Sequence, residues 1–246
     1  PDGKWIAYTQ GSEAKYALYS QDLLAVVPVS GGTARVVSPA LDRSLGDFVW
    51  SADGATVTGL LEDDRAWHIA RVDAASGRVE RLLEGRRVVQ DLAPGPGGKL
   101  AVLAGTAKQP NEIYAFENGA LRALTKVNEA WLREVQLATV EDFTAKGKDG
   151  TIVNALLTRP ANAPAGRALP LLLRIHGGPG AQDQHSFAFE REFFAANGYA
   201  VLQVNYRGSA GRGAAHQQAI FADWGNKEVK DLLAAVDQAI ATGVAD

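Results

Sequence analysis

Residues 171–180 read LLLRIHGGPG, an apolar run that ends in a histidine, two glycines and a proline. The run Pro170–His176 predicts a β-strand, and its continuous apolar character is typical of a strand that is buried on both faces of a sheet. Glycines directly after such a strand let backbone amides point into open space, because no side chain stands in the way. We therefore expect residues 176–180 to form a loop whose amides can receive a developing negative charge.

The segments around this strand predict alternating strands and helices. Residues 138–145 and 151–158 read as the two strands of a hairpin, and residues 199–206 read as a second apolar strand. Residues 187–197 predict one helix, and residues 227–241 predict another. Five apolar residues of the second helix fall on one face: Val229, Leu232, Leu233, Val236 and Ile240. This alternation is typical of an α/β sheet with crossover connections, and a further strand is expected to follow the last helix.

The first half of the chain, Pro1 to about Glu134, has short β-runs separated by turns. Two kinds of glycine turn alternate, with members of each kind roughly 42–51 residues apart. The first kind contains Gly3, Gly54 and Gly98, and the second contains Gly31, Gly77 and Gly119. Such turns describe a four-stranded unit repeated about three times, as in the blades of a β-propeller. A β-sandwich is the alternative, although it does not require two turns to alternate at a fixed period.

A chain with three blades would not close a propeller of four to eight blades. The chain also begins at Pro1 and contains no methionine. We therefore expect this sequence to be a piece of a longer protein, in which an N-terminal signal peptide would not be visible here.

The loop sequence His176-Gly177-Gly178-Pro179 carries the chemistry. A His-Gly-Gly loop that follows a strand supplies half of the oxyanion hole in α/β-hydrolases. A plain Gly-Pro turn is the alternative interpretation. Such a turn requires neither the histidine nor two glycines at the end of a buried strand.

Together with its neighbours, this loop resembles the prolyl oligopeptidase family of serine peptidases. The segments are residues 171–180, 193–201 (FFAANGYAV), 205–213 (NYRGSAGRG), 223–225 (DWG) and 231–232 (DL). The resemblance covers the whole chain and favours the acylaminoacyl-peptidase and dipeptidyl-peptidase type. It implies a partial β-propeller, the C-terminal blades, over residues 1–134. The N-terminal part of an α/β-hydrolase domain would follow over residues 135–246.

The resemblance also implies roles for individual residues. The Gly178 amide would donate to the oxyanion, with His176 and Gly177 forming the rest of the oxyanion loop. Dipeptidyl peptidases have tyrosine at the position of His176, so the histidine favours the acylaminoacyl type. Tyr206 and Arg207 would border the same cleft, and Arg207 would hydrogen-bond neighbouring loops. Short peptides are the implied substrates, no cofactor or metal is implied, and a homo-oligomer is left open.

The nucleophile elbow Gly-x-Ser-x-Gly does not occur in this sequence. The nearest segment is residues 207–211 (RGSAG), where Arg207 replaces the first glycine, and this disfavours Ser209 as the nucleophile. By the resemblance, the catalytic Ser, Asp and His follow in that order outside this sequence. We therefore expect this chain alone to be inactive, because an oxyanion donor without a nucleophile and base has nothing to stabilise.

The remaining histidines and the second glycine-rich segment have simpler interpretations. His68, His185 and His216 lack the spacing of metal ligands, and we predict surface or loop positions for them. Residues 208–213 have glycines at positions 1, 4 and 6, whereas a dinucleotide-binding loop needs positions 1, 3 and 6. Neither feature predicts a cofactor site.

The acidic and tryptophan residues of the first half also have simple interpretations. Glu62, Asp63 and Asp64 predict a solvated loop between strands, with recognition of a peptide amino terminus as the alternative. We predict that three tryptophans lie in the core between blades: Trp5, Trp50 and Trp67.

Composition excludes several classes of protein. The 25 Lys and Arg against 28 Asp and Glu give a net charge of −3, which argues against a nucleic-acid coat or a polybasic membrane binder. The chain has no cysteine, hence no disulfide, thiolate metal site or cysteine nucleophile. No apolar run approaches the length of about 18 residues that a membrane span needs. An esterase and a non-catalytic propeller binding module stay open as alternatives, as does the compartment, cytoplasmic or periplasmic.

Overall fold

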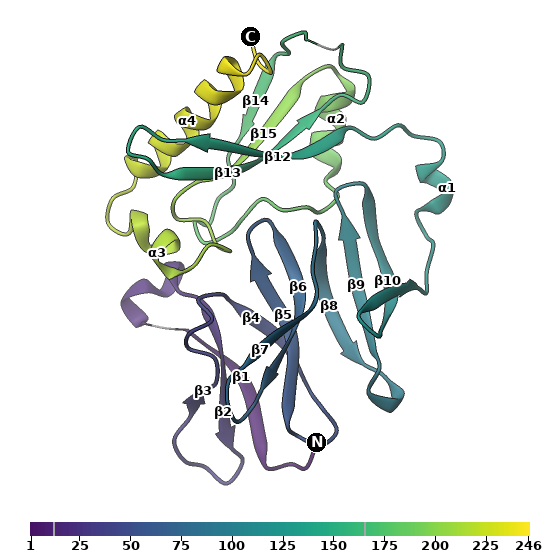
Figure 1. The fold of residues 1–246 in the computed structure, drawn as a ribbon, viewed down its shortest axis with the longest axis vertical. Helices are drawn as coiled ribbons and strands as arrows, with labels where there is room; N and C mark the ends of the chain where they lie inside the picture. Colours follow the sequence, from purple (N-terminus) through teal and green to yellow (C-terminus); the bar gives the residue numbers. More distant parts are fainter. Residues whose placement is uncertain (12, 165) are drawn as a thin grey trace.

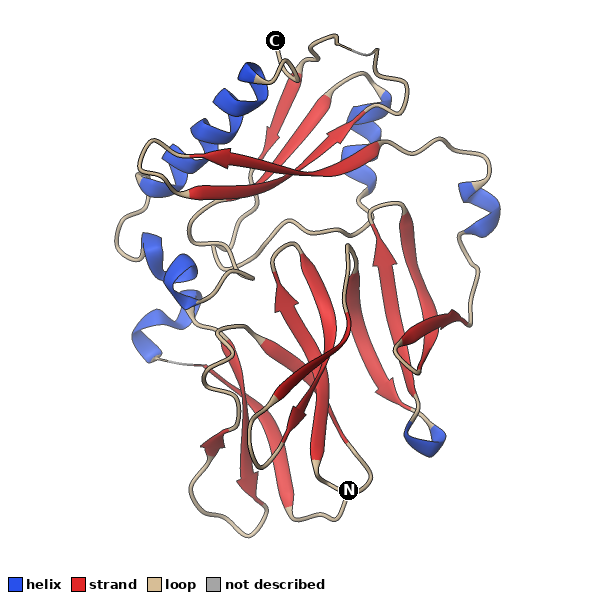
Figure 2. Ribbon diagram, in the orientation of Figure 1, coloured by secondary structure: helices blue, strands red, loops and turns tan. Residues whose placement is uncertain are grey.

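The computed structural model describes residues 1–11, 13–164 and 166–246, whose strands form three sheets (Figures 1 and 2). The strands are β1 (Trp5–Gly11), β2 (Asp22–Pro28), β3 (Arg35–Val36), β4 (Leu45–Trp50), β5 (Thr56–Asp63), β6 (Ala66–Asp73), β7 (Val79–Leu83), β8 (Val88–Pro94), β9 (Leu100–Thr106), β10 (Gln109–Glu117), β11 (Ala120–Ala123), β12 (Thr139–Lys146), β13 (Ile152–Arg159), β14 (Leu171–Arg174) and β15 (Ala200–Asn205). The α-helices are α1 (Glu129–Leu132), α2 (Phe189–Ala196), α3 (Ala214–Gln217) and α4 (Lys227–Ala241). Short 3₁₀ helices are η1 (Ala14–Tyr19), η2 (Pro96–Gly98) and η3 (Gln218–Ile220).

The first half consists of antiparallel strands in chain order. Strands β4–β7 form one four-stranded unit and β8–β11 form a second, and a parallel bridge between Trp67 and Val88 joins them. Strands β1, β2 and β3 form a sheet of their own. Four of the predicted turn glycines lie between the first two or the last two strands of these units: Gly54, Gly77, Gly98 and Gly119. Gly31 lies between β2 and β3, Gly3 precedes β1, and all six have positive φ. The four-stranded repeat is therefore present, although the described residues do not form a closed propeller.

The unit β4–β7 is covered on both faces, as the alternation of side chains in a strand allows. On β5, Val57 and Leu61 pack in a cluster with Leu24 and Val26 of β2. The side chain of Leu60 points to the opposite face and packs with residues of β8 and β9. Burial on two faces explains why consecutive residues of β5, such as Leu60 and Leu61, are both apolar.

The second half is a mixed sheet with strand order β12-β13-β15-β14. Strands β12, β13 and β15 pair antiparallel, and β14 pairs parallel to β15. Helix α4 packs its Leu232 and Ala235 with Leu202 of β15. The side chain of Arg191 on α2 reaches Gln203, whose side chain points to the other face of β15. The two helices therefore cover opposite faces, and the predicted hairpin, strands and helices of this half are confirmed.

The predicted burial of β14 is wrong. The side chains of residues 171–174 are half-buried, and Ile175 is 54% exposed. Strand β14 is the last strand of the described sheet, with β15 on one side. Its apolar sequence suggested two neighbours, but on the other side it has one isolated bridge, between Leu169 and Ala245.

The predicted face of α4 is only partly correct, because Leu232 and Val236 pack on the core but the other three residues do not. Val229, Leu233 and Ile240 are exposed, and the buried residues of this helix are Asp231, Leu232, Ala235 and Ala239. Alanine side chains let the helix approach the sheet closely, and the buried Asp231 is paired with Arg207. The face that α4 turns toward the sheet is therefore set by an ion pair and small residues, and the positions of large apolar residues alone do not predict it.

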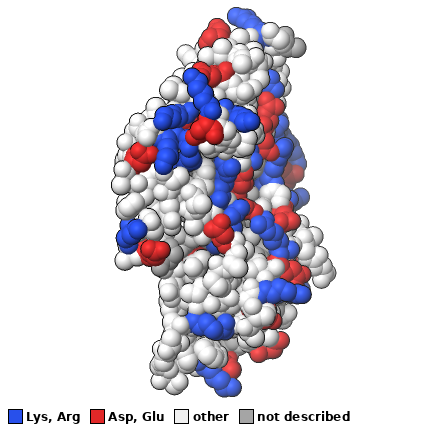
Figure 3. Space-filling view, turned by 60° about the vertical axis from the view of Figure 1, so that its left-hand side comes forward, with Lys and Arg blue, Asp and Glu red and all other residues white. Residues whose placement is uncertain are grey.

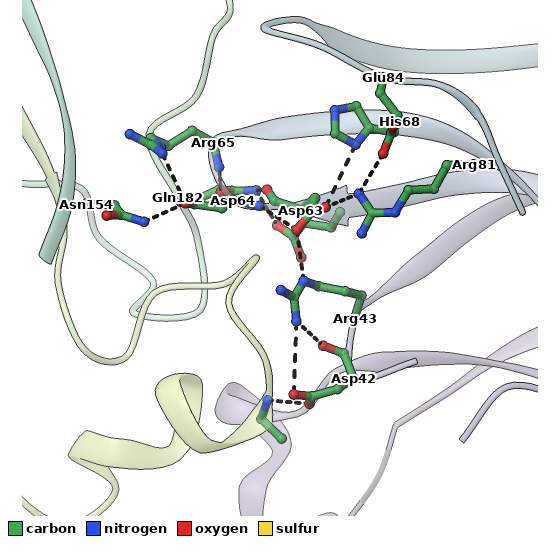
Figure 4. A network of polar contacts seen from close by, with 12 residues as sticks. Asp42, Arg43, Asp63, Asp64, Arg65, His68, Arg81, Glu84, Asn154 and Gln182 are labelled. Carbon is green, nitrogen blue, oxygen red and sulfur yellow. Dashed lines mark hydrogen bonds and ion pairs between the residues drawn. The ribbon is translucent and has the colours of Figure 1, made fainter. Parts of the chain in front are cut away.

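The turn between β5 and β6 contacts the second half of the chain (Figure 4). Asp63 accepts hydrogen bonds from Arg43 Nε at 2.9 Å and from Arg81. Asp64 accepts one from Asn154 on β13, and the Arg65 amide donates to Gln182 Oε1 at 2.7 Å. The prediction of a solvated acidic loop is therefore wrong, because Asp63 and Asp64 join the two halves and Glu62 is buried.

His68 and Trp5 also differ from their predicted positions, and His185 lies in a loop, as predicted, but is buried there. His68 on β6 is buried beside the Gly85 carbonyl, 3.2 Å from its Nε2, because its strand is covered on both faces. His185 is buried with its Nε2 3.0 Å from Asp142 Oδ1, and burial lowers the pKa of this histidine despite the carboxylate. Trp5 is 47% exposed, whereas Trp50 and Trp67 are half-buried. Trp5 lies at the start of β1, where no further strand of the described chain covers it.

Glu62 makes the stability of this contact between the two halves depend on pH. Burial raises its pKa from 4.5 to about 7, and hydrogen bonds from Ser44 and Gln182 offset this in part. Between pH 4.5 and about 7, the unfolded chain loses this proton while the folded chain keeps it, so stability falls as pH rises through this window. We expect Glu62→Gln to raise the melting temperature most above pH 7, with little effect below pH 4.5. Melting curves from pH 4 to 8 measure this, and a pH-independent difference would contradict it.

Candidate active site

The loop of residues 176–180 follows β14 and exposes two backbone amides. Gly177 and Gly178 are both exposed, and their amides donate no hydrogen bond to any part of the chain that the structure describes. Gly178 has φ +135°, which side chains rarely allow, and a Cβ there would lie 3.0 Å from the Ala181 nitrogen. A Cβ at Gly177 would meet nothing within 4 Å. The conformation of the loop therefore requires glycine at position 178 in particular.

The side chain of His176 lies beneath the loop and not in the open space above it. It is buried, and its ring stacks on Tyr206 with centroids 4.6 Å apart. Its Nδ1 lies 3.0 Å from the Gly177 carbonyl oxygen, and its Nε2 lies 2.9 Å from Ser209 Oγ. Both ring nitrogens are thus engaged, so this side chain is not free to donate to a bound substrate as a tyrosine hydroxyl would.

The pair Ser209 and His176 has the spacing of a nucleophile and its base, but its surroundings do not suit that role. Ser209 is 0% exposed, so a substrate carbonyl has no route to its hydroxyl. The other ring nitrogen of His176 faces a backbone carbonyl and not the carboxylate that orients a catalytic histidine. The geometry therefore agrees with the sequence in disfavouring Ser209 as a nucleophile.

A buried polar network holds the far end of the loop, and sequence reasoning missed it. The Asp183 amide donates to Asn205 Oδ1 at 2.8 Å, and Asn205 Nδ2 donates to the Asp183 carbonyl at 2.9 Å. Gln203 Nε2 donates to the Asp183 carboxylate at 2.8 Å, and Arg174 pairs with the same group. Burial raises the pKa of Asp183, against the effect of Arg174. Polar residues in an apolar strand, Gln203 and Asn205, were the signal available in the sequence.

Tyr206 and Arg207 directly follow β15, and their side chains contact different parts of the structure. Tyr206 is buried, and its hydroxyl donates to the His176 carbonyl at 2.6 Å. Arg207 donates to Asp231 through Nη2 at 2.7 Å and Nε at 2.9 Å, and through Nη1 to Asp149 at 2.7 Å. Hydrogen bonding to Asp231 raises the pKa of Arg207, against its burial. Tyr206 thus supports the loop, and Arg207 ties β15 to α4 and to the β12–β13 turn.

His216 lies next to Tyr206. Its Nε2 is 3.1 Å from the Tyr206 carbonyl oxygen, and burial lowers its pKa to about 4. The side chain is therefore neutral near pH 7 and donates to that carbonyl. It is half-buried on α3, where it supports the segment after β15 and not an exposed surface.

A groove of about 750 Å³ lies between the β12–β13 turn and α4, but it contains no residue of the 176–180 loop. Its charged lining residues are Lys146, Lys148, Asp149, Arg207, Lys230 and Asp237. Figure 3 shows Lys and Arg side chains interspersed with Asp and Glu on one face of the molecule. The groove offers no hydroxyl nucleophile and no histidine, so we place the candidate site at the loop instead.

The described residues include no cluster of three or more His, Asp or Glu side chains arranged to hold a metal ion. None of the helices in the described ranges has the length and apolar character needed to cross a membrane.

Known proteins are similar to this chain in sequence and in fold. The sequence pattern of the prolyl oligopeptidase family matches residues 185–246. Over 133 residues the chain is 38% identical to the uncharacterized peptidase YuxL of Bacillus subtilis, covering 54% of this chain and 20% of that protein. Over 244 residues it is 25% identical to dipeptidyl-peptidase 5 of Porphyromonas gingivalis, covering 97% of this chain and 35% of that protein.

Among solved structures, the uncomplexed acylaminoacyl peptidase of Pyrococcus horikoshii is similar with a TM-score of 0.86 and 21% identity, covering 100% of this chain and 38% of that chain. The fold is therefore that of a segment of an acylaminoacyl peptidase. The chain is therefore similar, over residues 185–246, to the prolyl oligopeptidase family, and over longer stretches to proteins named as peptidases. The matched segments span 20% and 35% of the length of these two curated relatives.

Proposed function

We propose that the protein containing this chain is a serine peptidase that cleaves short peptides, of the acylaminoacyl- or dipeptidyl-peptidase type. The observation that carries the proposal is the exposed Gly178 amide, which has no hydrogen-bond partner among the described residues and follows a sheet strand. In the reaction, this amide would stabilise the oxyanion that forms when a serine attacks the scissile carbonyl. A histidine would act as base and then as acid, and an aspartate would orient it.

The nucleophile, aspartate and histidine of this proposal lie outside the present sequence. His176 does not serve as the base, because its two ring nitrogens contact Gly177 and Ser209. The present chain would contribute Gly178 to the site and support it through His176, Gly177 and Tyr206. We further propose that the substrates are short peptides and that the reaction uses no cofactor.

The same proposal assigns residues 1–134 to propeller blades and residues 135–246 to the first part of an α/β-hydrolase domain. Two consecutive four-stranded antiparallel units, one covered on both faces, support the blades. The strand order β12-β13-β15-β14 with a helix on each face supports the hydrolase domain. In this arrangement, the β5–β6 turn holds the blades against the hydrolase domain beside the loop, where blades can limit substrate size.

A fluorophosphonate probe tests this function in the full-length protein. We expect one serine to be labelled, with labelling blocked by a competing peptide substrate. Faster turnover of peptides than of p-nitrophenyl esters would distinguish the peptidase from an esterase. A well-folded full-length protein that takes no label would contradict the proposal and favour a non-catalytic binding module.

A further inference from the structure

The hydrogen bonds of His176 define where its ring proton lies. The Gly177 carbonyl oxygen, 3.0 Å from Nδ1, is able to accept but not to donate, so Nδ1 carries a proton. The Ser209 hydroxyl, 2.9 Å from Nε2, is fully buried, and among the described residues its proton has no other acceptor. Nε2 is therefore the acceptor, and the ring is neutral with its proton on Nδ1.

This proton also fixes the orientation of a particular peptide group. The carbonyl of Gly177 and the amide of Gly178 belong to the same planar trans peptide, so the C=O and the N–H point in opposite directions. The carbonyl is held toward the His176 ring by the Nδ1 proton. The N–H of Gly178 is thereby directed away from the buried ring, on the side where both glycines are exposed.

The preceding peptide is fixed independently, so the restraint acts on one bond. The Tyr206 hydroxyl donates to the His176 carbonyl at 2.6 Å, and the two rings stack. Neither contact restrains the Gly177 carbonyl. The peptide between Gly177 and Gly178 rotates easily, because neither glycine has a side chain. The hydrogen bond from His176 is therefore its specific restraint, and it depends on Ser209.

We propose that Ser209 is a positioning residue: its hydroxyl sets the tautomer of His176 and so directs the Gly178 amide toward the oxyanion. This inference rests on the proposed function for its catalytic consequence. Without the hydroxyl, the proton is free to occupy Nε2. The lone pair of Nδ1 would then face the lone pairs of the Gly177 carbonyl, and the peptide group would turn away.

The test compares variants of the full-length protein in a peptidase assay. We expect Ser209→Ala to lower kcat by about tenfold to a hundredfold, part of the effect of removing an oxyanion donor, with KM within about twofold. Ser209→Thr keeps the hydroxyl and should restore most of kcat. Thr158→Val is the matched control, because it removes a buried hydroxyl on β13 that has no partner among the described residues.

A second measurement does not depend on catalysis. Nitrogen-15 NMR of histidine-labelled full-length protein, with the His176 signals assigned from a His176→Gln variant, reports which ring nitrogen carries the proton. A proton on Nδ1 in the wild type supports the inference, and a proton on Nε2 overturns it. Unchanged kcat in Ser209→Ala, or an equal loss in Ser209→Thr, would also overturn the positioning role. A wild type that cleaves no peptide would instead contradict the proposed function, while the NMR result still decides the tautomer.

Discussion

Replacing Gly178 by alanine is expected to lower kcat of the full-length peptidase by about a hundredfold or more, the effect of losing one oxyanion donor. Gly178 has φ +135°, and an alanine Cβ would lie 3.0 Å from the Ala181 nitrogen and 3.1 Å from the Gly180 nitrogen. The backbone must shift to accept the methyl group, and the shift turns the amide away from its present direction. The substrate is held by other contacts as well, so we expect KM to change much less than kcat.

Gly177→Ala is the matched control for this prediction. A Cβ at this position meets nothing within 4 Å, and the φ of Gly177 lies outside the positive range that side chains rarely adopt. It should keep kcat within a few fold of the wild type, with the same melting temperature. If both variants lost the same fraction of kcat, the loop would reject side chains for a reason unrelated to the Gly178 amide. If both kept kcat near the wild-type value, Gly178 would not be part of the oxyanion site.

Replacing Asp231 by alanine is expected to have the largest effect on stability. Asp231 is 1% exposed and accepts from the Arg207 amide at 2.8 Å as well as from the guanidinium. Removing it leaves a largely buried arginine and a backbone amide without their acceptor, which costs about 3–5 kcal/mol. For a domain of this size, we expect a melting temperature lower by roughly 6 °C or more. Thermal unfolding of the full-length protein, followed by circular dichroism, measures the change.

Asp149 offers the comparison, because it pairs with the same guanidinium from an exposed position. Exposed ion pairs contribute little, since water already solvates both partners. Asp149→Ala should therefore lower the melting temperature much less than Asp231→Ala. If the two variants were equally destabilised, burial of the Asp231 pair would not be the cause.

The strands and helices were predictable where local pattern alone decides them. The apolar residues of β15 and the turn glycines between the antiparallel strands lie close together in the chain, so spacing and glycine content identified them. The loop at 176–180 was identified for a similar reason, because a glycine-rich segment after an apolar strand is a local feature. Helix α4 was predicted with its observed bounds, since a single amphipathic period covers all of it.

Burial and partners were less predictable because they depend on residues far away in the chain. The acidic residues at the β5–β6 turn looked solvated, yet Asn154 and Gln182 meet them from the second half. His185 lies in a loop, as the sequence allowed, but its burial beside Asp142 of β12 was not predictable. The buried face of α4 depends on Arg207, which lies 24 positions before Asp231.

The sequence by itself determined the order of strands and helices, the four-stranded repeat and the glycine loop, because each depends on neighbours a few residues apart. The tertiary structure alone decided how that loop is held. His176 and Ser209 are separated by 33 positions, and nothing in the sequence indicates that Ser209 determines which ring nitrogen of His176 carries the proton. Their contact exists because parallel strands β14 and β15 end at the same edge of the sheet, which brings the segments that follow them together.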